Sequence, residues 1–133
     1  MGLDIYFFAN EKDKTGIPPY PWKTVMSGDD IPVGFFRKVN ALFKWVEDHV
    51  GAFENCEKVP ITLAHLRALQ RDLQALTPEN CRLLFPTTEG FFFGSTDYDE
   101  GYWIDVEETK RWLETMIDTF DFDRKLLLFM AWW

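Results

Sequence analysis

The chain ends in the run Leu126-Leu127-Leu128-Phe129-Met130-Ala131-Trp132-Trp133, which is apolar throughout. A short, continuous apolar run favours a central or covered strand over a surface helix. The opening residues 2–8 are also rich in strand-forming side chains, with Asp4 and Tyr6 on one face and the apolar positions on the other. We expect the two ends of the chain to pair in one sheet.

Between these ends, the sequence predicts three or four helices. Apolar residues recur at helical spacing over residues 35–50 and again over residues 63–76, where Thr62 is the expected N-cap. The segment Thr77-Pro78-Glu79 begins a short helix over residues 80–84. Asp105 and Glu108 have capping-box spacing at the start of a last helix over residues 105–120.

The stretch over residues 11–33 is rich in proline and is expected to be a long surface loop. Together these patterns predict a single α+β domain over residues 1–133. Three to four helices pack on a small antiparallel sheet formed by the N- and C-terminal strands. The hydrophobic content of 47% is ample for a core, and we assign most of the 17% aromatic residues to that core.

The formal net charge of −8 disfavours direct binding to nucleic acid or to an anionic membrane, because both are negatively charged. The same charge suits a basic partner, including a protein that itself handles nucleic acid. It also serves solubility, an interpretation that needs no partner. With no secretory signal visible and no apolar run near the ~20 residues of a membrane span, we expect a cytoplasmic protein with reduced Cys56 and Cys81.

An aromatic run followed by an acidic turn, residues 91–103, is the main candidate for a functional site. Residues 91–93 are predicted to be a short buried extended segment, and Asp97, Asp99 and Glu100 then bring three negative charges together. Such charges need a cation, a donor or water nearby. Arg37 is the expected partner, either in a structural ion pair or across a cleft that holds a polar ligand.

Other residues are expected near this turn. Arg37, Lys38 and Asn40 lie at the predicted start of the first helix, and Trp45 and Trp103 are the indoles expected to line a cleft. The full set of candidate ligand- or partner-binding residues is Asp4, Tyr6, Arg37, Lys38, Asn40, Trp45, Asp97, Tyr98, Asp99, Glu100 and Trp103.

No catalytic residue, cofactor or metal site is predicted. Asp4 and the acidic turn could supply oxygen ligands to Mg²⁺ or Ca²⁺, but their spacing does not match an EF-hand loop. His49 and His65 each stand alone, and no nucleophile, phosphate-loop or dinucleotide motif is present in the sequence.

Three segments resemble a family of small, uncharacterised bacterial and phage or prophage proteins. They are the opening Met1-Gly2-Leu3-Asp4-Ile5-Tyr6, the block from Val33 to Trp45 with its Phe36-Arg37-Lys38-Val39-Asn40 core, and the turn Phe92-Phe93-Gly94-Ser95-Thr96-Asp97-Tyr98-Asp99-Glu100. The resemblance implies a phage or mobile-element origin. It brings no established activity and assigns no catalytic residue.

Two functions therefore stay open at this point. The first is a non-enzymatic phage-type accessory protein whose acidic surface binds a host protein, with a nucleic-acid-handling defence enzyme as one candidate. The second is a small polar-ligand binder, nucleotide-like in its ligand, or an unrecognised enzyme. Its cleft would lie between Arg37, Asn40 and the turn over residues 97–100.

Overall fold

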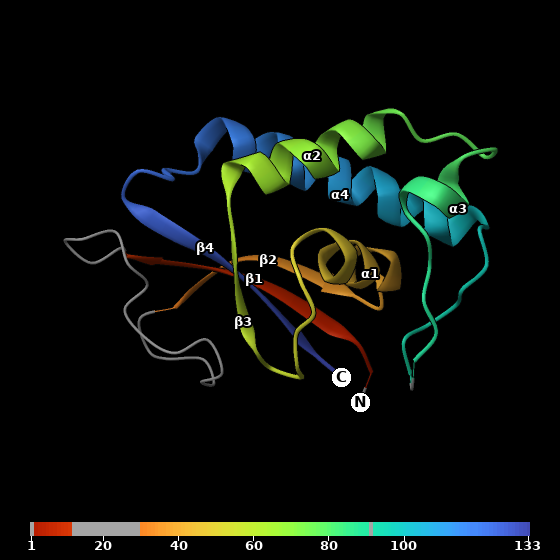
Figure 1. Cartoon of the computed structure of the whole chain (residues 1–133), viewed down its shortest axis with the longest axis horizontal. Coiled ribbons are helices and arrows are strands. Elements are labelled where there is room, and N and C mark those ends of the chain that lie inside the picture. Colours follow the sequence, from red (N-terminus) through yellow and green to blue (C-terminus); the bar gives the residue numbers. More distant parts are fainter. Residues whose placement is uncertain (1, 12–29, 91) are drawn as a thin grey trace.

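The computed structural model describes residues 2–11, 30–90 and 92–133. Within these ranges the elements follow one another as β1 (Asp4–Glu11), β2 (Ile31–Arg37), α1 (Asn40–His49), β3 (Lys58–Ile61), α2 (Leu63–Gln74), α3 (Cys81–Leu84), α4 (Glu100–Thr119) and β4 (Lys125–Trp132) (Figure 1). None of the helices in these ranges combines the length and the apolar character needed to cross a bilayer.

The four strands form one antiparallel sheet in the order β2-β1-β4-β3. The two terminal strands β1 and β4 are its central pair, with Ile5 opposite Ala131 and Phe7 opposite Phe129. The predicted α+β class and the pairing of the two chain ends are therefore confirmed. The edge strands β2 and β3 were not predicted as strands.

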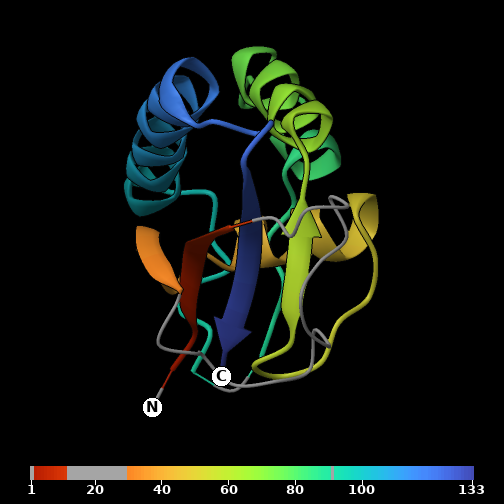
Figure 2. The ribbon, with the colours of Figure 1, turned by 90° about the vertical axis from the view of Figure 1, so that its left-hand side faces the viewer.

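The helices cover one face of the sheet, and α2 and α4 lie side by side and in contact (Figures 1 and 2). The main core lies between these layers and includes Ile5 and Phe7 of β1, Leu42 of α1 and Leu113 of α4. A smaller cluster of Phe8, Leu128 and Met130 is buried on the other face. The period-2 alternation of β1 thus places apolar residues on both faces.

The first helix begins at Asn40, so the prediction of a helix start at residue 35 is wrong. Phe36 belongs to β2, where it lies opposite Ile5 of β1. Lys38 then adopts a left-handed backbone conformation, with φ of 59°, between the strand and the helix. Residues 35–37 are extended rather than helical because they pair with residues 4–6 along one edge of β1.

The expected loop over residues 11–33 lies mostly outside the described residues. Its two described ends belong to strands, since Glu11 closes β1 and residues 31–33 open β2. Of the expected extended segment over residues 91–93, residue 91 lies outside the described ranges. Phe92 and Phe93 do not belong to a strand, and Phe92 is half-exposed with φ of 60°, whereas Phe93 is buried.

The last helix begins five residues earlier than predicted, at Glu100, and Asp99 rather than Asp105 is its N-cap. The Asp99 carboxylate accepts a hydrogen bond of 3.2 Å from the Tyr102 backbone N–H. The predicted cap of α2 is confirmed, because Thr62 Oγ1 accepts from the His65 N–H at 3.1 Å. His65 takes the reciprocal role usually filled by Glu or Gln, accepting from the Thr62 N–H through Nδ1.

Candidate functional site

A pocket of about 320 Å³ lies where the end of β2, the start of α1 and the first turns of α4 meet. The long connection between α3 and α4, at the right in Figure 1, contributes the remaining wall. The predicted residues that line it are Arg37, Lys38, Asn40, Asp97 and Asp99. The structure thus brings the two halves of the predicted cleft together.

Arg37 has a different partner from the one expected. Its Nη1 atom lies 2.8 Å from Oδ1 of Asp4, the residue directly opposite it in the β1–β2 pair. No ion pair joins Arg37 to the acidic turn within the described ranges. Because half of the Arg37 side chain is exposed, this ion pair contributes little stability, but it holds the guanidinium beside the pocket.

Lys38 lines the same wall as Arg37. Its backbone N–H donates to the Leu3 carbonyl at 2.7 Å, which fixes the turn between β2 and α1. Gly94 packs against this turn with φ of 91°, and a Cβ atom there would lie 3.0 Å from the Lys38 Cβ. Among the described residues, the Lys38 ammonium forms no ion pair.

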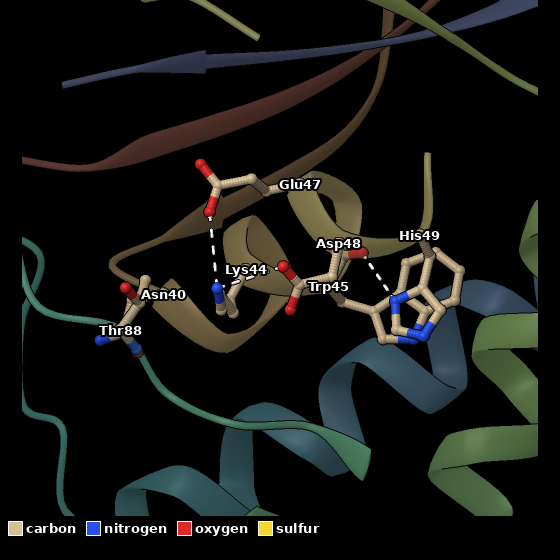
Figure 3. A network of polar contacts seen from close by, with 7 residues as sticks. All are labelled: Asn40, Lys44, Trp45, Glu47, Asp48, His49 and Thr88. Carbon is tan, nitrogen blue, oxygen red and sulfur yellow. Dashed lines mark hydrogen bonds and ion pairs between the residues drawn. The ribbon is translucent and has the colours of Figure 1, made fainter. Parts of the chain in front are cut away.

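Asn40 is buried and fully engaged in backbone contacts. Its Nδ2 donates to the Phe93 carbonyl at 3.1 Å and to the Ser95 carbonyl at 3.0 Å, while its Oδ1 accepts from the Thr88 N–H at 3.1 Å. Figure 3 shows Asn40 and Thr88 together at the start of α1. This side chain therefore links the helix to both segments of the connection between α3 and α4.

Two further side chains join those segments, which we call the loop wall (residues 86–90 and 93–99). The Thr87 N–H donates to Tyr98 Oη at 3.1 Å, and Thr87 Oγ1 donates to the Thr96 carbonyl at 2.9 Å. The Tyr98 ring packs edge-on against Tyr102 and lies beneath the Arg82 guanidinium, 4.6 Å from its centroid. Tyr98 thus acts as a support of the wall.

The three acidic residues of the turn, Asp97, Asp99 and Glu100, make different interactions. Asp99 caps α4, and the Asp97 N–H donates to Ser95 Oγ within the turn. Glu100 is the exposed first residue of α4, where a carboxylate interacts favourably with the helix dipole. The start of α4 therefore accounts for two of the three carboxylates of the acidic turn, Asp99 and Glu100.

Asp105 also lines the pocket, from the second turn of α4. Burial, and next the charges of Glu108 and Asp99, raise the pKa of this carboxyl to about 6. A carboxyl with a raised pKa in a cleft is a common feature of binding and catalytic sites. Its predicted role as a helix cap is wrong. The buried stripe of Val106 and Thr109 continues at helical spacing to Tyr102, three residues before Asp105. This spacing was the sequence signal for the earlier helix start.

Tyr102 forms part of the pocket floor. Its hydroxyl donates to the Phe85 carbonyl at 2.7 Å, and burial raises the pKa of the phenol above its ordinary value. The hydroxyl therefore stays protonated at any physiological pH. Neither Tyr102 nor Phe85 has a sequence pattern that marks it as a pocket residue, because both come to the site only through packing.

The remaining predicted residues do not line the pocket. Tyr6 packs on Phe8 and on Phe35, away from the main core. Trp45 is buried, and its Nε1 donates to Oδ2 of Asp72 at 3.0 Å, which satisfies the indole N–H. It stacks on His49 at the opposite end of α1 from Asn40 (Figure 3). Trp103 packs on Tyr102 beside the pocket.

No group of three or more His, Cys, Asp or Glu side chains converges as a metal site requires within the part of the chain that the structure describes. No protein-family model, curated protein or solved structure matches the chain.

Proposed function

We propose that the chain binds a small polar ligand of nucleotide type in the pocket at the start of α1 and α4. The observation that carries the proposal is the lining of the pocket, with Arg37 and Lys38 on one wall and Asp99 and Asp105 on the other. Its volume of about 320 Å³ is at the small end of the range of ligand sites.

The two walls suit different parts of such a ligand. The Lys38 ammonium and the Arg37 guanidinium attract a phosphate, and guanidinium in particular suits phosphate geometry. The start of α1 adds to this attraction, because Val39 at the N-cap has no side chain able to cap the helix. Carboxylates opposite accept hydrogen bonds from ribose hydroxyls or base amino groups.

A thermal-shift experiment with AMP, GMP, CMP and UMP tests the proposal. A ligand that binds only the folded state and is present at 100 times its Kd adds roughly 2.7 kcal/mol of stability, so we expect Tm to rise by several degrees with at least one nucleotide. Lys38→Asn removes the ammonium and tolerates the left-handed backbone, and we expect it to reduce the shift.

Lys110→Asn is the matched control for Lys38→Asn, because Lys110 lies on α4 outside the lining residues and pairs with Glu107. Its shift should equal that of the wild type. The proposal fails if no nucleotide raises Tm, or if both lysine variants respond to the nucleotide as the wild type does.

A second proposal rests on the exposed face of α4. Glu100, Glu107, Glu114 and Asp118 are all exposed and recur at helical spacing, so their carboxylates share one side of the helix. Such a surface suits a basic partner. Together with the resemblance to phage-type proteins, it supports binding to a host protein in the cytoplasm, for example a nucleic-acid-handling defence enzyme.

The double variant Glu107→Gln/Glu114→Gln tests this surface in pull-downs from bacterial lysate at low and high salt. We expect a specific partner to be captured by the wild type, to be lost from the double variant and to be released by salt. Glu79→Gln, an exposed acid in the α2–α3 connection, is the control and should retain the partner. If the double variant captures the partner as well as the wild type does, and high salt does not release it, the proposal is refuted.

A further inference from the structure

We propose that Asn40 is a positioning residue of the pocket, which places the loop wall and does not bind the ligand through its own side chain. This inference deepens the proposed function and rests on it. It assigns a new role to a residue that the sequence alone suggests as a direct ligand contact.

The hydrogen bonds of Asn40 carry the argument. The NH₂ group has two hydrogens, and both are donated, one to the Phe93 carbonyl and one to the Ser95 carbonyl. The amide oxygen accepts from the Thr88 N–H. Because only 3% of the residue is exposed, the amide has no donor left to offer to a molecule in the pocket.

The backbone groups that Asn40 holds are next to residues that line the pocket. Gly94 and Ser95 belong to one bound segment, and Thr87 precedes Thr88 in the other. The contacts of Thr87 with Tyr98 and Thr96 join the same two segments. Asn40 thereby ties both segments to the start of α1, which also lines the pocket.

When the wall is already ordered before the ligand binds, binding has a smaller entropic cost, because fewer loop residues must be immobilised. Asparagine is suited to the task because it both donates and accepts. Aspartate would set its oxygens against two carbonyl oxygens, and alanine would leave three backbone groups, one buried and two part-buried, without their partner. The effect of Asn40 on a ligand is therefore indirect and acts through the wall.

The test compares Asn40→Ala with the wild type by two measurements. Hydrogen exchange of the Thr88 amide reports the wall, and calorimetric titration with AMP, or with whichever of the four nucleotides gives the largest thermal shift, reports the pocket. We expect Thr88 exchange to accelerate by about tenfold, because this amide loses one hydrogen bond, and the nucleotide affinity to fall by at least as much, because the variant loses all three bonds that hold the wall.

Asn80→Ala is the matched control. Asn80 makes the same kind of two-sided contact, accepting from the Thr77 N–H at 2.7 Å and donating to the Ala75 carbonyl at 2.8 Å, in the connection between α2 and α3. We expect this variant to lower Tm while leaving the nucleotide affinity unchanged. If Asn40→Ala does not fold, Tyr98→Phe replaces it, because that change loosens the same wall and retains the ring.

Three results would overturn the inference. If Asn40→Ala exchanges faster at Thr88 but binds the nucleotide as the wild type does, Asn40 is only structural and the proposed function stands. If Asn80→Ala loses as much affinity, the effect is one of general stability. If the wild type binds none of the nucleotides, the inference and the proposed function fail together.

Discussion

Asp105 is a carboxyl whose ionisation the fold opposes. Burial, and then the nearby Glu108 and Asp99, raise its pKa from 3.8 to about 6. The folded state therefore holds this proton more tightly than the unfolded state. The stability from this group is fully present below pH 3.8 and is lost as the pH rises through about 6.

The variant Asp105→Asn removes this dependence. Between pH 5 and pH 7.5 we expect the wild type to lose about 0.5 to 1 kcal/mol relative to the variant, because the shift in pKa corresponds to at most about 1.4 kcal/mol over this interval and partial exposure reduces it. Urea denaturation at several pH values measures the difference. Asp118→Asn, an exposed change on the same helix, should keep the wild-type profile. Parallel profiles for wild type and Asp105→Asn would contradict the raised pKa.

Single residues also show why part of the site was predictable. Arg37, Lys38, Asn40, Asp97 and Asp99 were expected together because opposite charges and a polar amide on two segments suggest a shared site, and all five line the pocket. Their individual roles were not predictable. A cross-strand neighbour decides that Arg37 pairs with Asp4, and two distant loop carbonyls decide the orientation of Asn40.

At the scale of elements, the contact between β2 and α4 protects an edge of the sheet. Trp112 of α4 donates through Nε1 to the Val33 carbonyl at 2.9 Å, and Gly34 lies directly beneath the indole. Pro32 in the same strand has no N–H to donate. These features make β2 a poor template for pairing with another chain.

Gly34→Ala tests this contact. A Cβ atom at this position would lie 2.6 Å from Trp112 Nε1, so we expect a loss of about 1 to 3 kcal/mol in the free energy of unfolding. Trp112→Phe creates space and removes the hydrogen bond. The double variant should therefore lose less than the sum of the single variants in denaturant titrations. Simple additivity would show that the two residues do not interact.

At the scale of the whole molecule, buried residues lie on both faces of the sheet, and the face away from the main core holds an ion pair. Lys58 lies opposite Met130 on that face and is fully buried, and its ammonium contacts Asp30. Asn10 donates to the second oxygen of the same carboxylate. The pair connects the edge strand β3 to the residue just before β2, across the width of the sheet.

Lys58→Met leaves the Asp30 carboxylate buried without this cation. We expect a loss of roughly 3 to 5 kcal/mol in unfolding free energy, measured by denaturant titration, whereas the double variant Lys58→Met/Asp30→Leu should recover most of it. Lys110→Met removes a partly exposed lysine whose ion pair with Glu107 lies at the surface, and it should change stability little. If the Lys58→Met protein is as stable as the wild type, the buried ion pair between Lys58 and Asp30 does not stabilise the sheet.

The sequence by itself determined the α+β class, the pairing of the two terminal strands, the Thr62 cap and the α2 and α3 helices. The cap and the two helices depend on hydrophobic period and on capping side chains, which act between residues close in the chain. The pairing of the chain ends was predictable because both ends are strand-like in composition and the C-terminal run is continuously apolar, as a central strand requires. Only the tertiary structure decided that residues 35–37 form a strand, that α4 starts at Glu100, and that Asp105 faces a pocket. Each of these depends on which distant segment packs alongside, because strand pairing and burial are set by neighbours far away in the sequence.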